Sequence, residues 1–164
     1  ENNYFKVMKI KIREATISDM QVVHKLIVEL AIYEEEPNEV DINIKDLENM
    51  GYVYKNPLFT CFVAEVEKQV VGAAIIYNRF STWKGKTLHL EDLIVTKKMR
   101  GKGIGSRLFD KVISFGKKSG AMRISWNVID WNKNAIEFYK NRGAKIVEGW
   151  SIVHLSGKEL VNYN

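Results

Sequence analysis

Three glycines on alternate positions, set between an apolar segment and an amphipathic one, constrain this sequence most strongly. Residues 90–95 are mostly apolar, a basic turn follows, and Gly101, Gly103 and Gly105 lead into a helix expected at residues 104–118. Glycine has no Cβ and reaches positive φ, so successive amide N–H groups can point into one concavity. The first amides of the helix and the positive end of its dipole add to this concavity. The segment predicts a strand–loop–helix unit that binds an anion such as a pyrophosphate.

Length and composition place the chain among globular proteins. Its 164 residues suffice for a single domain, with residues 1–7 as a short N-terminal extension. Hydrophobic residues make up 46% and charged residues 27%, a balance that argues against a disordered chain. No apolar run approaches the roughly 18 residues that span a bilayer, and the N-terminus lacks a signal-peptide core. The single cysteine, Cys61, cannot form an internal disulfide, so we expect a cytoplasmic protein without membrane contact.

Charge is unevenly distributed along the chain. Residues 34–48 contain seven acids and one base, whereas residues 97–123 contain nine bases and one acid. Solvated helix faces account for such runs in many proteins. The alternative is that one region binds an anion and the other a cation. Because the bases gather around the glycine loop without an aromatic RNA-binding pattern, we expect no nucleic-acid partner.

The hydrophobic periodicity predicts a chain of alternating strands and helices. Strands are expected at residues 8–14, 59–67, 70–80, 87–95, 123–129, 144–147 and 150–155, and helices at residues 18–35, 41–50, 104–118 and 132–141. The segments at 59–67 and 70–80 are separated by two residues and read as an antiparallel hairpin. This order is typical of the α/β class, with a mixed sheet and helices against its faces.

Three glycine motifs compete to explain the loop. A P-loop requires Gly-Lys-Ser/Thr, but Gly103 follows Gly101-Lys102. A dinucleotide fingerprint lies early in a βαβ unit and has Gly or Ala where Ser106 stands here. The pattern Arg/Gln-x-x-Gly-x-Gly/Ala is met by residues 100–105. In this motif the chain resembles the GNAT superfamily of acyl-CoA-dependent N-acyltransferases, in which the loop and helix N-terminus hold the pyrophosphate of coenzyme A.

Further blocks narrow this resemblance. Leu90-Glu-Asp-Leu-Ile-Val, Glu29-Leu-Ala-x-Tyr-Glu34 and the block from Trp131-Asn to Arg-Gly-Ala144 are similar to the spermidine/spermine (diamine) N-acetyltransferase branch and its thialysine-acetylating relatives. The match spans residues 12–160. It implies the GNAT fold, with a mixed central sheet of about seven strands flanked by about four helices. It also implies a homodimer, and acetyl transfer from acetyl-CoA to a primary amine by direct attack in a ternary complex.

The resemblance assigns coenzyme A binding to one strand end, the glycine loop and a later helix. The residues so assigned are Leu93, Ile94, Val95, Arg100, Gly101, Lys102, Gly103, Ile104, Gly105, Ser106, Asn132 and Ala135. A backbone N–H at residues 93–95 is expected to stabilise the negative carbonyl oxygen of the tetrahedral intermediate. The same three side chains also read as core, and Asn132 also reads as a helix N-cap. Each pair of roles can hold at once.

Two side chains are expected to move protons. An amine with a pKa near 10.4 is only about 0.04% neutral at pH 7, so a carboxylate that takes its proton promotes attack. Glu91 is the candidate base, and an ordinary acid at a strand edge is the alternative. Tyr139 matches the general acid of the family, which protonates the leaving thiolate. A tyrosine on the apolar stripe of a helix is otherwise a core residue.

The acceptor side is assigned by resemblance to Tyr33, Glu34, Trp83, Glu91 and Asp92. Polyamine-specific members carry an acid two residues before the tryptophan, where this chain has Ser81. A diamine, thialysine or another lysine-like amine is therefore favoured over a long polyamine.

Two other functions remain open from the sequence. One keeps the chemistry and changes the acceptor to a protein N-terminus or a lysine side chain, because the acidic segment attracts basic peptides as well. The other is a module that binds acyl-CoA without turnover, against which the presence of Tyr139 and Glu91 argues. No spacing of His, Cys and Asp indicates a metal site.

Overall fold

The computed structural model describes residues 8–164, which form two compact units. The first ends at Asn127, and the second runs from Val128 to Asn164. The extension expected at residues 1–7 lies outside the described residues. The single-domain expectation stays a prediction. The two units are described separately below.

The first unit contains one mixed sheet. Within the described residues the strands are β1 (Ile10–Glu14), β2 (Thr60–Val66), β3 (Gln69–Ser81), β4 (Gly85–Val95) and β5 (Ile124–Ser125). They lie in the order β1-β2-β3-β4-β5. The first four pair antiparallel, and β5 pairs parallel to β4. The predicted α/β class and mixed sheet are confirmed.

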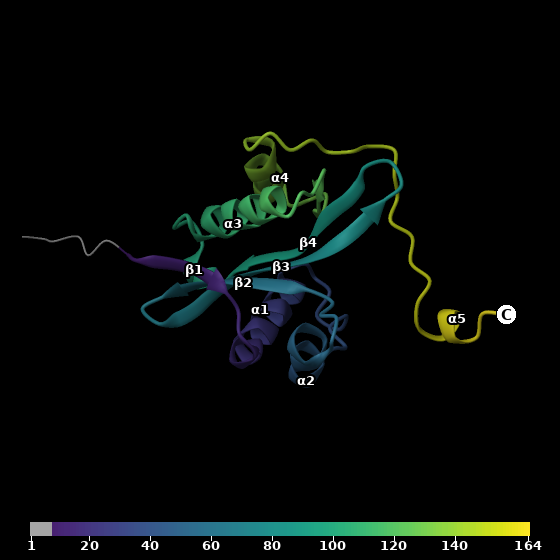
Figure 1. The fold of residues 1–164 in the computed structure, drawn as a ribbon, viewed down its shortest axis with the longest axis horizontal. Coiled ribbons are helices and arrows are strands. Elements are labelled where there is room, and N and C mark those ends of the chain that lie inside the picture. The colour runs from purple at the N-terminus through teal and green to yellow at the C-terminus, as the bar shows by residue number, and fades with distance from the viewer. Residues whose placement is uncertain (1–7) are drawn as a thin grey trace, which may run out of the picture. The chain divides into compact units, whose positions relative to one another are not determined.

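Helices cover both faces of this sheet (Figure 1). On one face lie α1 (Met20–Tyr33) and α2 (Ile44–Glu48), and on the other lies α3 (Ile104–Lys118). Buried Val23 and Leu26 of α1 pack in one cluster with Val63, Ile75 and Ile94 of the sheet. This apolar stripe fixes α1 over the centre of the sheet, where it contacts both β3 and β4.

A glycine lets α3 approach the sheet closely. A Cβ on Gly116 would lie 2.5 Å from Ile124 Cδ1, so a larger residue would push α3 away from β5. Phe115, one residue earlier, packs edge-on against Phe62 with ring centroids 5.5 Å apart. The close contact fixes the direction of α3, and hence the position of the loop that precedes it.

The structure corrects several predicted elements. Five strands are present in the described residues, not about seven, because residues 144–147 and 150–155 form no strand. Apolar alternation reports which side chains share a face, but a strand also needs a neighbour for its backbone hydrogen bonds. Of the strand expected at residues 123–129, only β5 is formed, because only these two residues pair with β4. Helix α2 begins later than expected, where Asn43 Oδ1 accepts the amide of Asp46.

The second unit contains α4 (Lys133–Lys140) and α5 (Gly157–Val161). The expected helix at residues 132–141 corresponds to α4, whereas α5 was not predicted. Between these helices the chain is irregular and exposes large apolar side chains, among them Val147, Trp150 and Val153.

Candidate functional site

Strand β4 carries a bulge at Glu91. Across from it, Ile75 pairs with Asp92 and Ile76 pairs with Leu90, so Glu91 is one extra residue on β4. A bulge re-aims side chains that strict alternation would send to opposite faces. The charge of Glu91 acts on Asp92, and Asp92 lies two residues before Ile94, which packs in the cluster beneath α1. The bulge concentrates two negative charges at one point of the sheet.

A third carboxylate completes this cluster. Glu34 follows the last residue of α1. Burial, together with the charges of Glu91 and Glu34, raises the pKa of Asp92 to about 7. Burial also raises the pKa of Glu34. Because the three groups repel one another when ionised, a cation among them relieves the repulsion, and the cluster is suited to a cationic ligand.

The raised pKa of Asp92 has a consequence for stability. The folded protein binds this proton more tightly than the unfolded chain, whose aspartate titrates near pH 3.8. The contribution to stability is therefore complete below about pH 4 and is lost as the pH rises to about 7. We expect Asp92→Asn, which never ionises, to raise the free energy of unfolding by about 1–3 kcal/mol at pH 8 and by little at pH 4.

Urea denaturation at the two pH values measures this difference. Asp41→Asn is the matched control, because Asp41 is an exposed carboxylate in the acidic loop. The control should leave the unfolding free energy unchanged at both pH values. A gain from Asp92→Asn that is equal at pH 4 and pH 8 would contradict a buried, proton-binding carboxylate.

Two rings border Glu91. His89 Nε2 lies 3.7 Å from Glu91 Oε2, and His89 Nδ1 lies 3.3 Å from Ser125 Oγ. The ring of Tyr77 has its centroid 5.1 Å from that of His89. Burial, then the charge of Glu91, raises the pKa of Tyr77, while burial lowers the pKa of His89. Glu91 itself keeps 55% of its side-chain surface exposed, so an incoming amine can reach it.

Strand β5 covers only part of the outer edge of β4. The two strands pair at two positions, of which His89–Ser125 is the last. Beyond it, β4 continues to Val95 with β3 on one side and, among the described residues, no strand on the other. The outer edge of β4 is thus open between the carboxylate cluster and the glycine loop. An extended ligand can add to such an edge as a further strand does.

The backbone groups that face this edge follow from the hydrogen bonds at its end. Thr96 N–H donates to Val71 O at 2.9 Å, so Thr96 faces β3. Val95 O instead accepts from Arg100 Nε at 2.8 Å. Because backbone groups alternate along an antiparallel strand, the N–H groups of Leu93 and Val95 point to the open edge.

The glycine loop has the backbone that the sequence predicts. Gly101 and Gly103 have φ values of 73° and 78°, which other residues rarely adopt. Gly103 immediately precedes α3, whose first amides have no helical acceptor. Gly105 differs, since a Cβ there would meet only Val95 Cγ2, at an ordinary 3.8 Å. Its lack of a side chain is not required by the protein's own packing.

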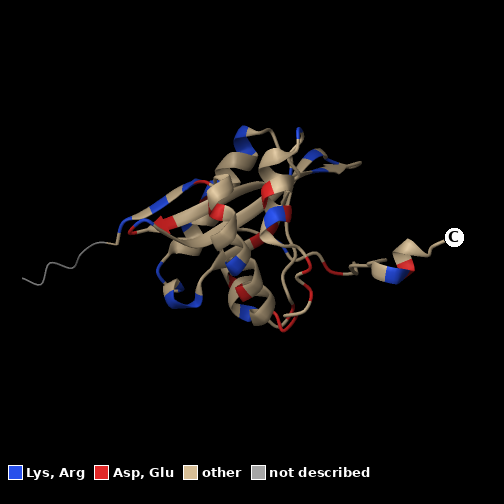
Figure 2. Cartoon of the chain, turned by 90° about the horizontal axis from the view of Figure 1, so that it is seen from below, with Lys and Arg blue, Asp and Glu red and all other residues tan. Residues whose placement is uncertain are grey.

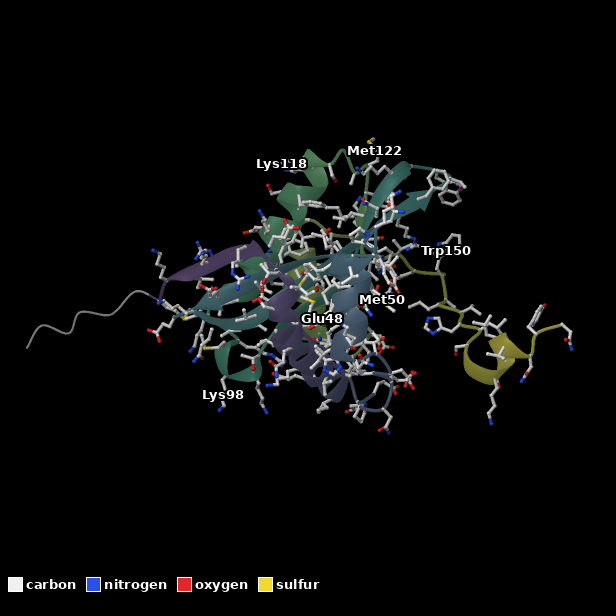
Figure 3. All side chains as sticks on the ribbon, turned by 60° about the horizontal axis from the view of Figure 1, so that its bottom comes forward. Glu48, Met50, Lys98, Lys118, Met122 and Trp150 are labelled. Atoms are coloured by element: carbon white, nitrogen blue, oxygen red, sulfur yellow. The ribbon has the colours of Figure 1, made fainter. Side chains whose placement is uncertain are left out.

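Charge separates the two ends of this site (Figure 2). Basic residues gather on the turn before α3, and acidic residues on the loop after α1. Lys98 projects outward from the basic turn (Figure 3). An anion is therefore favoured at the glycine loop, and a cation near the carboxylates.

Two other residues were predicted to contact the acceptor. Tyr33 ends α1 directly before Glu34, and the guanidinium of Arg100 stands 4.9 Å from the centroid of its ring. Trp83 occupies the turn between β3 and β4 and is 76% exposed. From Gly85 to Glu91, β4 rises by roughly 20 Å, so the chain does not place Trp83 beside Glu91.

Sequence reasoning gave no role to Glu29 or Tyr77. Glu29 lies on α1 one helical turn before Tyr33, and this spacing could have placed both on one face. Tyr77 pairs with His89 across the hairpin, and that register was not readable from the sequence.

The second unit contains the remaining predicted residues. Asn132 Oδ1 accepts the amide of Ala135 at 3.2 Å, so Asn132 does cap α4. Tyr139 is buried, and its ring packs edge-on against Phe138 with centroids 5.2 Å apart. The guanidinium of Arg142 stacks over the ring of Phe138, 3.7 Å from its centroid. The catalytic role of Tyr139 stays a prediction.

Known proteins resemble this chain in sequence and in fold. Residues 21–144 match the model of the acetyltransferase (GNAT) family. A thialysine N-epsilon-acetyltransferase from Bos taurus is 36% identical over 162 residues, covering 92% of this chain and 95% of its own. A spermidine/spermine N(1)-acetyltransferase-like protein 1 from Homo sapiens is 32% identical over 93% of this chain, which spans 23% of that longer protein. A solved integron cassette protein from the mobile metagenome of V. cholerae has the same fold, with a TM-score of 0.75 and 23% identity over 94% of this chain and 96% of its own.

The chain belongs to the acetyltransferase (GNAT) family. It is an N-acetyltransferase, and the resemblance seen in its sequence blocks is confirmed. Over residues 8–164, no group of three or more His, Cys, Asp and Glu side chains could hold a metal ion. No helix in the same range is both long and apolar enough to cross a membrane.

Proposed function

We propose that the protein transfers the acetyl group of acetyl-CoA to a primary amine of a small diamine-, polyamine- or lysine-like substrate. The observation that carries this proposal is the layout of β4. Its bulge holds Glu91 and Asp92, its open edge follows, and the anion-binding loop at Gly101–Gly105 lies just beyond its end. One strand thereby connects a cation site to an anion site.

The donor occupies the loop and the open edge. Its pyrophosphate lies against the glycine loop and the first amides of α3, where the positive helix dipole favours it. Its arm runs along residues 93–95 as an added strand. The N–H of Leu93 or Val95 then donates to the thioester oxygen, and this bond strengthens as that oxygen becomes negative. No metal is required in this scheme.

The reaction proceeds by direct attack within a ternary complex. The amine loses a proton to Glu91, directly or through a water molecule, and its lone pair forms the new C–N bond. The intermediate loses the remaining ammonium proton to solvent and collapses, the C–S bond breaks, and the thiolate takes a proton from Tyr139, whose phenolate regains one from solvent. Asp92 and Glu34 hold the cationic part of the acceptor by charge.

The names of the relatives and the residue at position 81 favour a short or lysine-like amine as the acceptor. The bovine relative is a thialysine acetyltransferase by name, and the human relative is named for its likeness to spermidine/spermine acetyltransferases. At the tip of the β3–β4 hairpin, Ser81 stands where an acid would favour a longer polyamine. Its hydroxyl accepts the amides of Trp83 and Lys84 at 3.3 Å, which closes the turn.

A panel of amines tests this substrate class. With acetyl-CoA at saturation, kcat/KM should be at least about ten-fold higher for a diamine or thialysine than for spermine. Release of free thiol measures each rate. Ser81→Asp is the informative companion, because an added carboxylate should raise kcat/KM for spermine and leave the value for thialysine nearly unchanged. Spermine as the best substrate of the unaltered protein would contradict the assignment.

A protein amino group is the second candidate acceptor. The acidic residues of the loop after α1 favour it, since they attract basic peptides as well as small cations (Figure 2).

We also propose a homodimer in the cytoplasm. The exposed apolar side chains between α4 and α5 support an association of this kind, because exposed patches of that type commonly mark interfaces.

A further inference from the structure

One carboxylate from α1 holds the turn that joins β4 to the glycine loop. Glu29 Oε2 accepts the hydroxyl of Thr96 at 2.9 Å, and Glu29 Oε1 accepts the backbone N–H of Lys97 at 2.6 Å. Thr96 and Lys97 lie more than sixty residues later in the chain. The two oxygens thus bind two successive groups at the point where β4 ends.

Glu29 also faces the arginine of the loop motif. Arg100 Nη2 lies 3.8 Å from Glu29 Oε1, while Arg100 Nε donates to Val95 O at 2.8 Å. The guanidinium stands over the ring of Tyr33, one helical turn after Glu29 on α1. Arg100 is therefore oriented by three groups before any ligand binds, and two of them come from α1.

These contacts matter because the glycine loop has little of its own to restrict its backbone conformation. Gly101 and Gly103 carry no side chains that could pack, and fixing glycine costs more conformational entropy than fixing other residues. Basic residues on the turn also repel one another. A carboxylate that accepts two hydrogen bonds and faces a guanidinium offsets both effects, since charge-assisted hydrogen bonds are the stronger kind.

We propose that Glu29 is a positioning residue for the acyl donor: it holds Thr96, Lys97 and Arg100 so that the glycine loop is preset for the pyrophosphate. This inference rests on the proposed function, because it takes acetyl-CoA as the ligand of the loop. Glu29 touches no reacting atom. Its effect is confined to the affinity for the donor, since ordering the loop on binding would otherwise reduce that affinity.

Calorimetric titration with acetyl-CoA and steady-state kinetics test this role. Glu29→Ala should raise the Kd and KM for acetyl-CoA by about ten-fold or more, with kcat at saturating donor and the KM for the amine within about two-fold of the parent values. Glu29→Gln keeps one acceptor oxygen and loses the charge, so its Kd and KM for acetyl-CoA should lie between those of the parent protein and those of Glu29→Ala. Thr96→Val removes one partner of Glu29, so its effect should be smaller and should vanish in the Glu29→Ala background.

Two controls separate positioning from general destabilisation. Glu48→Ala breaks the exposed Lys45–Glu48 pair on α2 (Figure 3) and should change neither donor affinity nor kcat. Amide exchange of Lys97 in the protein without ligand should accelerate in Glu29→Ala, because its acceptor is lost.

The outcomes distinguish this inference from the proposed function. Unchanged acetyl-CoA affinity in Glu29→Ala, or an equal loss in Glu48→Ala, would overturn the positioning role while the proposed function stands. A fall in kcat without a change in donor affinity would also overturn it. If the unaltered protein fails to bind acetyl-CoA, the proposed function itself fails, and the donor-side role of Glu29 fails with it.

Discussion

Replacing Tyr139 by phenylalanine should lower kcat by about 10²–10⁴-fold while acetyl-CoA affinity changes little. The phenol is the proposed donor of the proton that the leaving thiolate takes, and removing one oxygen removes that proton. The ring remains, so its edge-on contact with Phe138 and its place on the buried side of α4 are kept. Single-turnover thiol release, with calorimetry for donor binding, separates the chemical step from binding.

Tyr54→Phe is the matched control for this substitution. It deletes the same oxygen from a half-exposed tyrosine after α2, and both kcat and donor affinity should match the parent protein. Parent-like turnover in Tyr139→Phe would reject Tyr139 as the general acid. A large loss of thermal stability in Tyr139→Phe would instead identify a structural role for its hydroxyl group.

Replacing Gly103 by alanine should weaken acetyl-CoA binding by about ten-fold or more. Gly103 immediately precedes α3, and nothing lies within 4 Å of the Cβ that alanine would add. Its φ of 78° is one that alanine adopts only with strain, so the melting temperature should fall modestly. In the proposed site the added methyl group stands where the pyrophosphate approaches the first amides of α3, so donor affinity should fall as well.

Gly120→Ala is the matched control just beyond the other end of the same helix. Gly120 has a φ of 75°, which alanine also adopts only with strain, and nothing lies within 4 Å of its added Cβ. This variant should lower the melting temperature by a similar amount and leave acetyl-CoA affinity unchanged. Unaltered affinity in Gly103→Ala would contradict the placement of the pyrophosphate, whatever happens to stability.

The anion loop was predictable from the sequence because its requirements are local. Glycines on alternate positions after a strand favour positive φ, and both Gly101 and Gly103 have it, with open space where a Cβ would stand. The apolar stripes of α1 and α3 are also local signals, since helical periodicity repeats within a few turns. Most of the sheet followed from alternation in the same way, including the hairpin of β2 and β3.

The rest depended on pairing between distant segments. The bulge at Glu91 is an extra residue on β4 relative to β3, so it is defined only once the register between the two strands is known. The contacts of Glu29 with Thr96 and Lys97 depend on where α1 lies against the sheet. The prediction of strands at residues 144–147 and 150–155 was wrong. Their apolar alternation predicts which side chains share a face, but it does not supply the neighbouring strand with which the backbone would pair.

Transfer of a labelled acetyl group to an amine tests the central claim most directly. The protein is incubated with acetyl-CoA carrying ¹³C in its carbonyl group and with a diamine or thialysine, and the amine is analysed by mass spectrometry. The account predicts a ¹³C-acetylated amine in amounts equal to the free thiol released, and almost none of it with Glu91→Gln or Tyr139→Phe. Binding of acetyl-CoA without any labelled amine across the panel would contradict it and would leave a module that binds the coenzyme without transfer.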